Sequence, residues 1–166
     1  MAAPTVLTCP NHDARPAGLP IDMLVLHYTG MPNGAAAMTR LRDASAKVSA
    51  HYLIEEDGRV FQLVPEERRA WHAGAAYWRG HRDINGRSIG IELVNLNDGK
   101  DPFPGAQLDA LRELLRDIVS RHPIRHIIPH YECAIPPGRK SDPAGFDESW
   151  FRGILPESPP PKFRSI

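Results

Sequence analysis

Two histidines and an aspartate in this sequence have the chemistry of a catalytic zinc site. His27 closes an apolar segment, His130 closes a second one, and Asp142 follows twelve residues later. Two neutral imidazole nitrogens and one carboxylate oxygen would fill three positions around a tetrahedral ion and leave the fourth open, which is the pattern of catalytic zinc. These three residues are therefore candidate ligands of one Zn²⁺ ion.

Glu92 and Lys140 are candidates for the chemical steps beside such an ion. Glu92 lies in an apolar run, on the strand face that it shares with Gly90 and Val94. An unpaired buried carboxylate costs several kcal/mol, so Glu92 needs a cation, a hydrogen-bond network or a metal nearby. A carboxylate could move protons there, and the Lys140 ammonium could stabilise an oxyanion. A salt bridge is the alternative explanation for Glu92.

Spacing alone leaves other ligand sets open. A histidine that ends an apolar strand is commonly structural, and this explanation also applies to His27. His126 is a rival ligand, because residues 126, 128 and 130 share one face of a strand. The two cysteines, Cys9 and Cys133, lie far apart without CxxC spacing, which excludes a disulfide framework and a thiolate-only zinc site.

Composition indicates one globular domain. The chain has 166 residues, of which 42% are hydrophobic and 24% charged, values that are ordinary for a soluble protein. Twenty basic and twenty acidic residues balance, which argues against a large nucleic-acid interface. No GxGxxG or GxxxxGK[ST] motif supports phosphate binding.

The sequence favours a cytoplasmic protein. No apolar run reaches the roughly 18 residues that a membrane span needs. The first ten residues lack the basic start and apolar stretch of a signal peptide. A periplasmic location is the alternative if a signal peptide has been removed. The oligomeric state stays open.

The residue patterns predict a single α/β domain with a mixed central sheet and flanking helices. The strands are expected at residues 21–28, 51–64 (a hairpin with a two-residue turn at Asp57-Gly58), 88–94 and 124–130. A short helix is expected at 35–42, and long loops at 65–87 and 131–147.

The clearest helix follows residue 105. Its apolar stripe contains Leu108, Leu111, Leu115 and Ile118, and His122-Pro123 ends it. We expect residues 1–20 to form an arm packed on the domain, residues 21–154 to form the domain, and residues 155–166 to form a proline-rich tail.

Five motifs follow one another in a fixed order along the chain. They are Leu26-His27-Tyr28-Thr29, Val48 to Ile54, Ala70-Trp71-His72-Ala73-Gly74, Ser88-Ile89-Gly90-Ile91-Glu92-Leu93, and His130 through Pro143. Together they resemble one enzyme family, the zinc-dependent N-acetylmuramoyl-L-alanine amidases of type 2, which share their fold with peptidoglycan recognition proteins. The likeness runs from about Ile21 to Pro143.

This resemblance implies a zinc groove on one side of the sheet and a role for each matching residue. It implies that His27, His130 and Asp142 are the zinc ligands. It also implies that Glu92 and Lys140 are the catalytic residues. The family's W-H-A-G loop lies beside the substrate groove, so we expect Trp71 and His72 to contact substrate. His51 lies in a family-like motif but is expected to be packed.

The last motif departs from the family pattern G-H-S-D-I-A-P-G-R-K-x-D. Pro129 replaces the first glycine, and two extra residues separate His130 from Asp142. Because residues 138–142 keep the motif, we expect the loop to bulge before Gly138 and restore the ligand geometry. Cys133 falls in the extra stretch, where a thiol ligand is the alternative.

The function that the resemblance implies is zinc-dependent hydrolysis of the amide between N-acetylmuramic acid and L-alanine in peptidoglycan fragments. Recycling of anhydro-muropeptides, similar to AmpD-like proteins, is the expected role. The alternatives are an amidase that acts on polymeric cell wall, a peptidoglycan-binding module without activity, and a zinc hydrolase for another amide.

Overall fold

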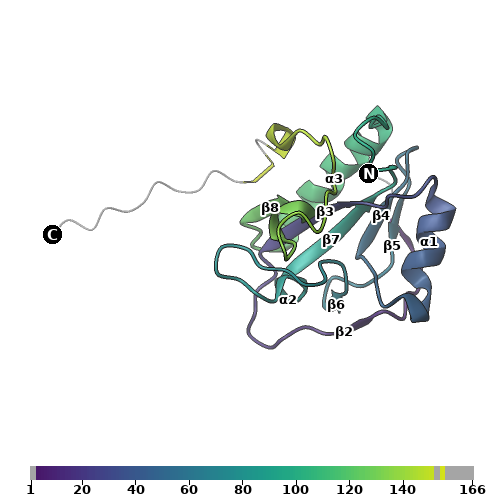
Figure 1. Ribbon diagram of the computed structural model, residues 1–166. Helices are drawn as coiled ribbons and strands as arrows, with labels where there is room; N and C mark the ends of the chain where they lie inside the picture. Colours follow the sequence, from purple (N-terminus) through teal and green to yellow (C-terminus); the bar gives the residue numbers. More distant parts are fainter. Residues whose placement is uncertain (1–2, 152–153, 156–166) are drawn as a thin grey trace.

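A six-stranded mixed sheet forms the centre of the protein in the computed structural model, which describes residues 3–151 and 154–155 (Figure 1). The strand order is β1-β5-β4-β7-β3-β8, and β2 pairs with β6 in a separate two-stranded sheet. The strands are β1 (Thr5–Val6), β2 (His12–Ala14), β3 (Met23–Tyr28), β4 (Tyr52–Ile54), β5 (Val60–Gln62), β6 (Arg68–Ala70), β7 (Ser88–Leu93) and β8 (His126–Pro129).

Helices cover both faces of this sheet (Figure 1). They are α1 (Gly34–Arg42), α2 (Ile84–Arg87), α3 (Gly105–Arg121) and α4 (His130–Cys133), with 3₁₀ turns at Ala44–Ala46 and Glu148–Phe151. No helix in the described part of the chain is long and apolar enough to cross a membrane. Of the expected tail at 155–166, all but Leu155 lies outside the described residues.

The parallel pair β3 and β7 separates an apolar face from a polar one. Leu26 and Ile91 are register partners, and both pack in the core cluster formed with α3. The next pair is His27 and Glu92. Because successive side chains point to opposite faces of a sheet, His27 and Glu92 lie together on the other face.

The buried face of α3 is rotated from the expected stripe. Leu114 is buried, whereas Leu108 is only partly buried. In the first turn the fully buried residue is Gln107, whose amide donates to the carbonyl oxygens of Ile54 and Val94 at 3.2 and 3.0 Å. The carbonyl oxygen of Ile54 also accepts the backbone N–H of Val94 at 3.0 Å, so Gln107 joins the first turn of α3 to the ends of two strands.

The expected hairpin forms between β4 and β5, but the prediction of a two-residue turn is wrong. Ile54 pairs with Val60, and the backbone N–H of Gly58 donates to the carbonyl of Glu55 at 3.0 Å. Gly58 has a φ of +86°, and a Cβ atom there would lie 2.8 Å from the carbonyl oxygen of Ala106. The loop is longer because Gly58 takes a left-handed conformation after the turn.

The segment 65–87 is not a continuous loop, since it contains β6 and α2. β6 pairs with β2 from the first twenty residues, and β1 adds to the edge of the main sheet beside β5. Strands of two or three residues show no readable alternation, which is why the sequence did not reveal them. That residues 1–20 form an arm separate from the domain stays a prediction.

Arg15 ties the N-terminal arm to this segment. Its partly buried guanidinium donates to the carbonyl oxygens of Glu66, Asn85, Gly86 and Ser88 at 2.8–3.2 Å. The arm therefore holds the start of β7, the strand that carries Glu92.

Candidate metal centre

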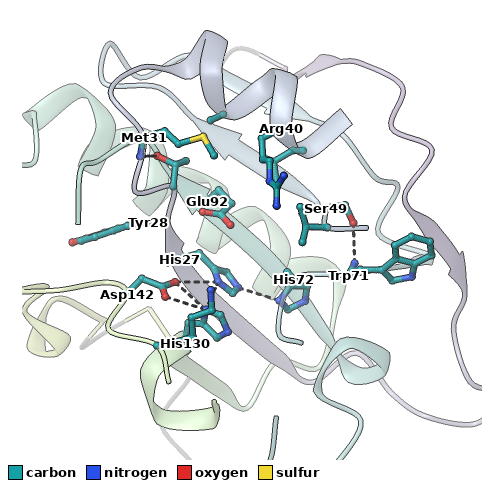
Figure 2. A pocket seen from close by; sticks show the side chains of 15 residues that line it. His27, Tyr28, Met31, Arg40, Ser49, Trp71, His72, Glu92, His130 and Asp142 are labelled. Carbon is teal, nitrogen blue, oxygen red and sulfur yellow. Dashed lines mark hydrogen bonds and ion pairs between the residues drawn. The ribbon is translucent and has the colours of Figure 1, made fainter. Parts of the chain in front are cut away.

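The structure brings the three candidate ligands together (Figure 2). The Nδ1 atoms of His27 and His130 are 3.0 Å apart. Oδ2 of Asp142 lies 3.0 Å from Nδ1 of His130 and 3.3 Å from Nδ1 of His27. All three side chains are buried.

Separate elements deliver these ligands to one point. His27 is held in β3, between β7 and β8, whereas His130 is the first residue of α4 and directly follows β8. Asp142 returns from the loop after α4, and its carbonyl accepts the backbone N–H of Tyr131 at 3.0 Å. The two extra residues in this loop therefore leave Asp142 beside His130.

The donor set fits a tetrahedral cation. Ligand atoms of a tetrahedral zinc site are about 3.3 Å apart when the bonds are about 2.0 Å long, close to the spacing of these three atoms. Burial and the charge of His130 lower the pKa of His27 to about 4, so this ligand is neutral at pH 7. The third donor is a carboxylate oxygen of Asp142.

The rival ligands are directed elsewhere. The ring of His126 packs against Trp78 at an interplanar angle of 58°, with centroids 4.8 Å apart. The thiol of Cys133 lies 3.4 Å from the carbonyl oxygen of His130, and burial raises its pKa to about 12. In the described part of the chain, the metal-binding cluster consists of His27, His130 and Asp142 alone.

Glu92 lies above the cluster (Figure 2). Its Oε2 atom is buried and has no hydrogen-bond partner among the described residues. Burial raises the pKa of Glu92 to about 8, and the charge of Asp142 acts in the same direction, whereas Lys140 opposes it. This carboxylate is therefore available for a proton rather than committed to a salt bridge.

A cavity of about 210 Å³ opens beside these residues. Exposed Lys140, from the loop before Asp142, and Arg40 of α1 are both among the residues that line it. Trp71 is at the margin, with its ring turned away from the three ligands (Figure 2). The cavity thus combines acidic, basic and metal-binding groups on one face of the sheet.

His72 lines the cavity, and its ring is held by protein partners. It is only 9% exposed, and both ring nitrogens have protein partners: Nδ1 is 3.0 Å from Nε2 of His27, and Nε2 is 3.0 Å from Oγ of Ser88. His51 is fully buried, as expected, and its Nδ1 accepts the backbone N–H of Gly90 at 3.0 Å. Sequence reasoning missed Ser88, although it stands in the motif that contains Glu92.

Comparison with known sequences agrees with this site. Residues 17–145 match the family described as N-acetylmuramoyl-L-alanine amidase. The chain is 34% identical to the 1,6-anhydro-N-acetylmuramyl-L-alanine amidase AmpD of Citrobacter freundii, over 90% of this chain and 88% of that protein. It is 39% identical to the N-acetylmuramoyl-L-alanine amidase AmiD of Escherichia coli K12, over 74% of this chain but 49% of AmiD. The chain thus spans about half the length of AmiD.

Solved structures confirm the expected α/β fold with a mixed central sheet. A crystal structure of a selenomethionine derivative of AmpD matches with a TM-score of 0.81 at 30% identity, over 94% of this chain and 96% of that one. The complex of E. coli AmiD with anhydro-N-acetylmuramic acid-L-Ala-D-γ-Glu-L-Lys matches with a TM-score of 0.69 at 38% identity, over 76% of this chain and 54% of that one. On sequence and fold together, the chain belongs to the N-acetylmuramoyl-L-alanine amidase family.

Proposed function

We propose that this chain is a zinc-dependent amidase that hydrolyses the bond between N-acetylmuramic acid and L-alanine in small anhydro-muropeptides. One observation carries the proposal. The Nδ1 atoms of His27 and His130 and the carboxylate of Asp142 converge within 3.3 Å. On the same face of the sheet lies Glu92, whose Oε2 atom has no hydrogen-bond partner in the described part of the chain. A non-catalytic binding module has no need of that carboxylate.

Zinc is the metal that the donor set favours, because two imidazole nitrogens, one carboxylate and an open position are typical of catalytic zinc. Bound Zn²⁺ would supply a Lewis acid for the scissile carbonyl and make an attacking water more acidic. Glu92 accepts the proton of that water and delivers it to the leaving amine of L-alanine. Lys140 donates a hydrogen bond to the developing oxyanion from the open side of the cavity.

The substrate class is supported by the relatives. AmpD of C. freundii is named for the 1,6-anhydro sugar, and the AmiD structure holds an anhydro-muramyl tripeptide. At about 210 Å³, the cavity is below the roughly 300–1,000 Å³ of sites that enclose a whole ligand. We therefore propose that it holds the scissile junction, while the sugar and the peptide extend along its margins past Trp71.

A cleavage assay on a defined anhydro-muramyl tripeptide tests this function. Mass spectrometry should detect free peptide with the purified protein, none after chelation, and recovery when Zn²⁺ is restored. A parallel assay on insoluble cell wall separates the two amidase hypotheses. Binding of muropeptide without cleavage, in protein shown to carry zinc, would contradict the proposal. We also propose that the protein is located in the cytoplasm, which cell fractionation would test.

A further inference from the structure

The histidine of the W-H-A-G loop contacts a metal ligand, and a chain of hydrogen bonds determines where its proton lies. The chain starts at Ser88, whose Oγ atom is 2.5 Å from the carbonyl oxygen of Ile84. A carbonyl oxygen can only accept, so the Ser88 hydroxyl donates to it. The lone pairs of Ser88 Oγ then face Nε2 of His72 at 3.0 Å, and Nε2 must carry the proton.

The same logic passes through the His72 ring to His27. Burial favours the neutral ring, so a proton on Nε2 leaves Nδ1 of His72 as an acceptor. Nε2 of His27 lies 3.0 Å from that acceptor and therefore carries the proton of its own ring. The remaining nitrogen of His27 is Nδ1, the atom that faces His130 and Asp142.

From this series of hydrogen bonds we propose that His72, oriented by Ser88, is a positioning residue. It holds His27 in the tautomer whose Nδ1 carries no proton and can bind zinc. The inference rests on the proposed function for the identity of the metal. It gives His72 a role toward the metal ligand, beside the substrate contact expected from the sequence, which stays a prediction. Fixing the tautomer of a metal-binding histidine through its other nitrogen is a general way to raise metal affinity.

The ring of His72 also packs closely against Gly90 of β7. A Cβ atom at Gly90 would lie 2.4 Å from Cγ of His72. The φ angle of Gly90 is not positive. A glycine is needed in this strand because a larger residue would occupy the space of the His72 ring, not because of an unusual backbone angle. Oδ1 of Asn85 accepts the backbone N–H groups of His72 and Ala73 at 3.2 and 2.9 Å. Ring and backbone are both fixed.

Ala73, the next residue in the loop, determines the tautomer of the second histidine ligand, His130. The carbonyl oxygen of Ala73 lies 3.2 Å from Nε2 of His130. Because this oxygen only accepts, Nε2 of His130 carries the proton and Nδ1 is bare. Two consecutive loop residues thus prepare both histidines as Nδ1 ligands, one with a side chain and one with the backbone.

The first test compares two substitutions of His72. His72→Asn keeps an oxygen near the position of Nδ1 that can accept from His27, whereas His72→Phe removes the acceptor. Competition with a chromophoric chelator should show zinc affinity 10- to 100-fold weaker in H72F and within a few fold of wild type in H72N. H126F is the matched control, because His126 packs against Trp78 outside the cluster, and the zinc affinity of this variant should be unchanged.

The second test reads the tautomer directly. Long-range ¹H–¹⁵N spectra of the metal-free protein should show His27 protonated at Nε2 in wild type and H72N, and a mixture of tautomers in H72F. S88A removes the acceptor for His72 while keeping the ring, and should shift His27 the same way if H72F fails to fold.

The outcomes separate this inference from the proposed function. Wild-type zinc affinity in H72F and S88A, with the His27 tautomer unchanged, would overturn the role of His72. If the wild-type protein binds no zinc, the proposed function fails, and the His27 tautomer alone decides the role of His72.

Discussion

His27 and Glu92 are direct register partners across the parallel strands β3 and β7. The candidate metal ligand and the candidate proton-transfer group are therefore held side by side by backbone pairing in the most buried part of the sheet. A shift of either strand by one residue would turn one of the two side chains toward α3. The distance between them is thus a property of the sheet, whereas Asp142 and Lys140 depend on a loop.

Replacement of Glu92 by glutamine should abolish most activity without loss of metal. The amide keeps the size of the side chain but cannot accept the proton of the attacking water, so turnover should fall by about 10²-fold or more. Zinc content by mass spectrometry should equal that of wild type, because Glu92 is outside the ligand cluster. Full activity of E92Q would mean that another group moves the proton.

The candidate ligands could be identified from the sequence because strand ends and motif order carry the information. His27 and His130 each end an apolar run, and parallel strands bring such ends to one edge of the sheet. Asp142 was the difficult residue, since its loop is longer than the family pattern. The bond from Tyr131 to the Asp142 carbonyl, which closes that loop, leaves no trace in the sequence.

The surroundings of the site were harder to predict. The contact between His72 and Gly90 joins a loop to a strand, and no residue periodicity reports which ring lies over a glycine. The spacing of apolar residues predicted that Leu108 is buried. The buried face of α3 also depends on the carbonyl groups of Ile54 and Val94, which accept hydrogen bonds from Gln107. Such contacts depend on tertiary packing, which the spacing of apolar residues does not encode.

Asp142 should be essential for metal binding. In Asp142→Asn the shape of the side chain is kept while its negative charge is lost, so two neutral nitrogens and an amide would face the cation. Zinc affinity should fall by more than the 10- to 100-fold typical of residues that only support ligands, as measured by chelator competition. D109N, on the exposed surface of α3, is the control. Unchanged affinity in D142N would remove Asp142 from the ligand set.

Gly90→Ala should weaken both the fold and the metal site. The new methyl group would lie 2.4 Å from Cγ of His72, so either the ring or the strand must move. Overpacking of this kind costs about 1–3 kcal/mol, which urea denaturation of the metal-free protein would measure. Gly105→Ala is the matched control, because nothing lies within 4 Å of a Cβ atom there. Equal stability and zinc affinity in both variants would show that His72 adapts without cost.

Glu66 should make the fold sensitive to acid. Its carboxylate accepts from Tyr52, Arg121 and His122 at 2.7, 2.8 and 2.6 Å. Burial raises the pKa of Glu66, but these bonds outweigh it and lower the pKa to about 2. Since the unfolded chain then binds the proton more tightly than the folded one, the stabilisation is complete above about pH 5 and is lost as the pH falls toward 2.

Glu66→Gln tests this linkage. The shift corresponds to roughly 2–3 kcal/mol at neutral pH, so E66Q should be less stable than wild type by about that amount at pH 7, and the two stability curves should converge toward pH 2. Denaturant unfolding between pH 3 and pH 7 measures both curves. E67Q is the control, because the Glu67 side chain is exposed and its loss should leave the pH dependence unchanged. Parallel curves for E66Q and wild type would show that another carboxylate governs the acid response.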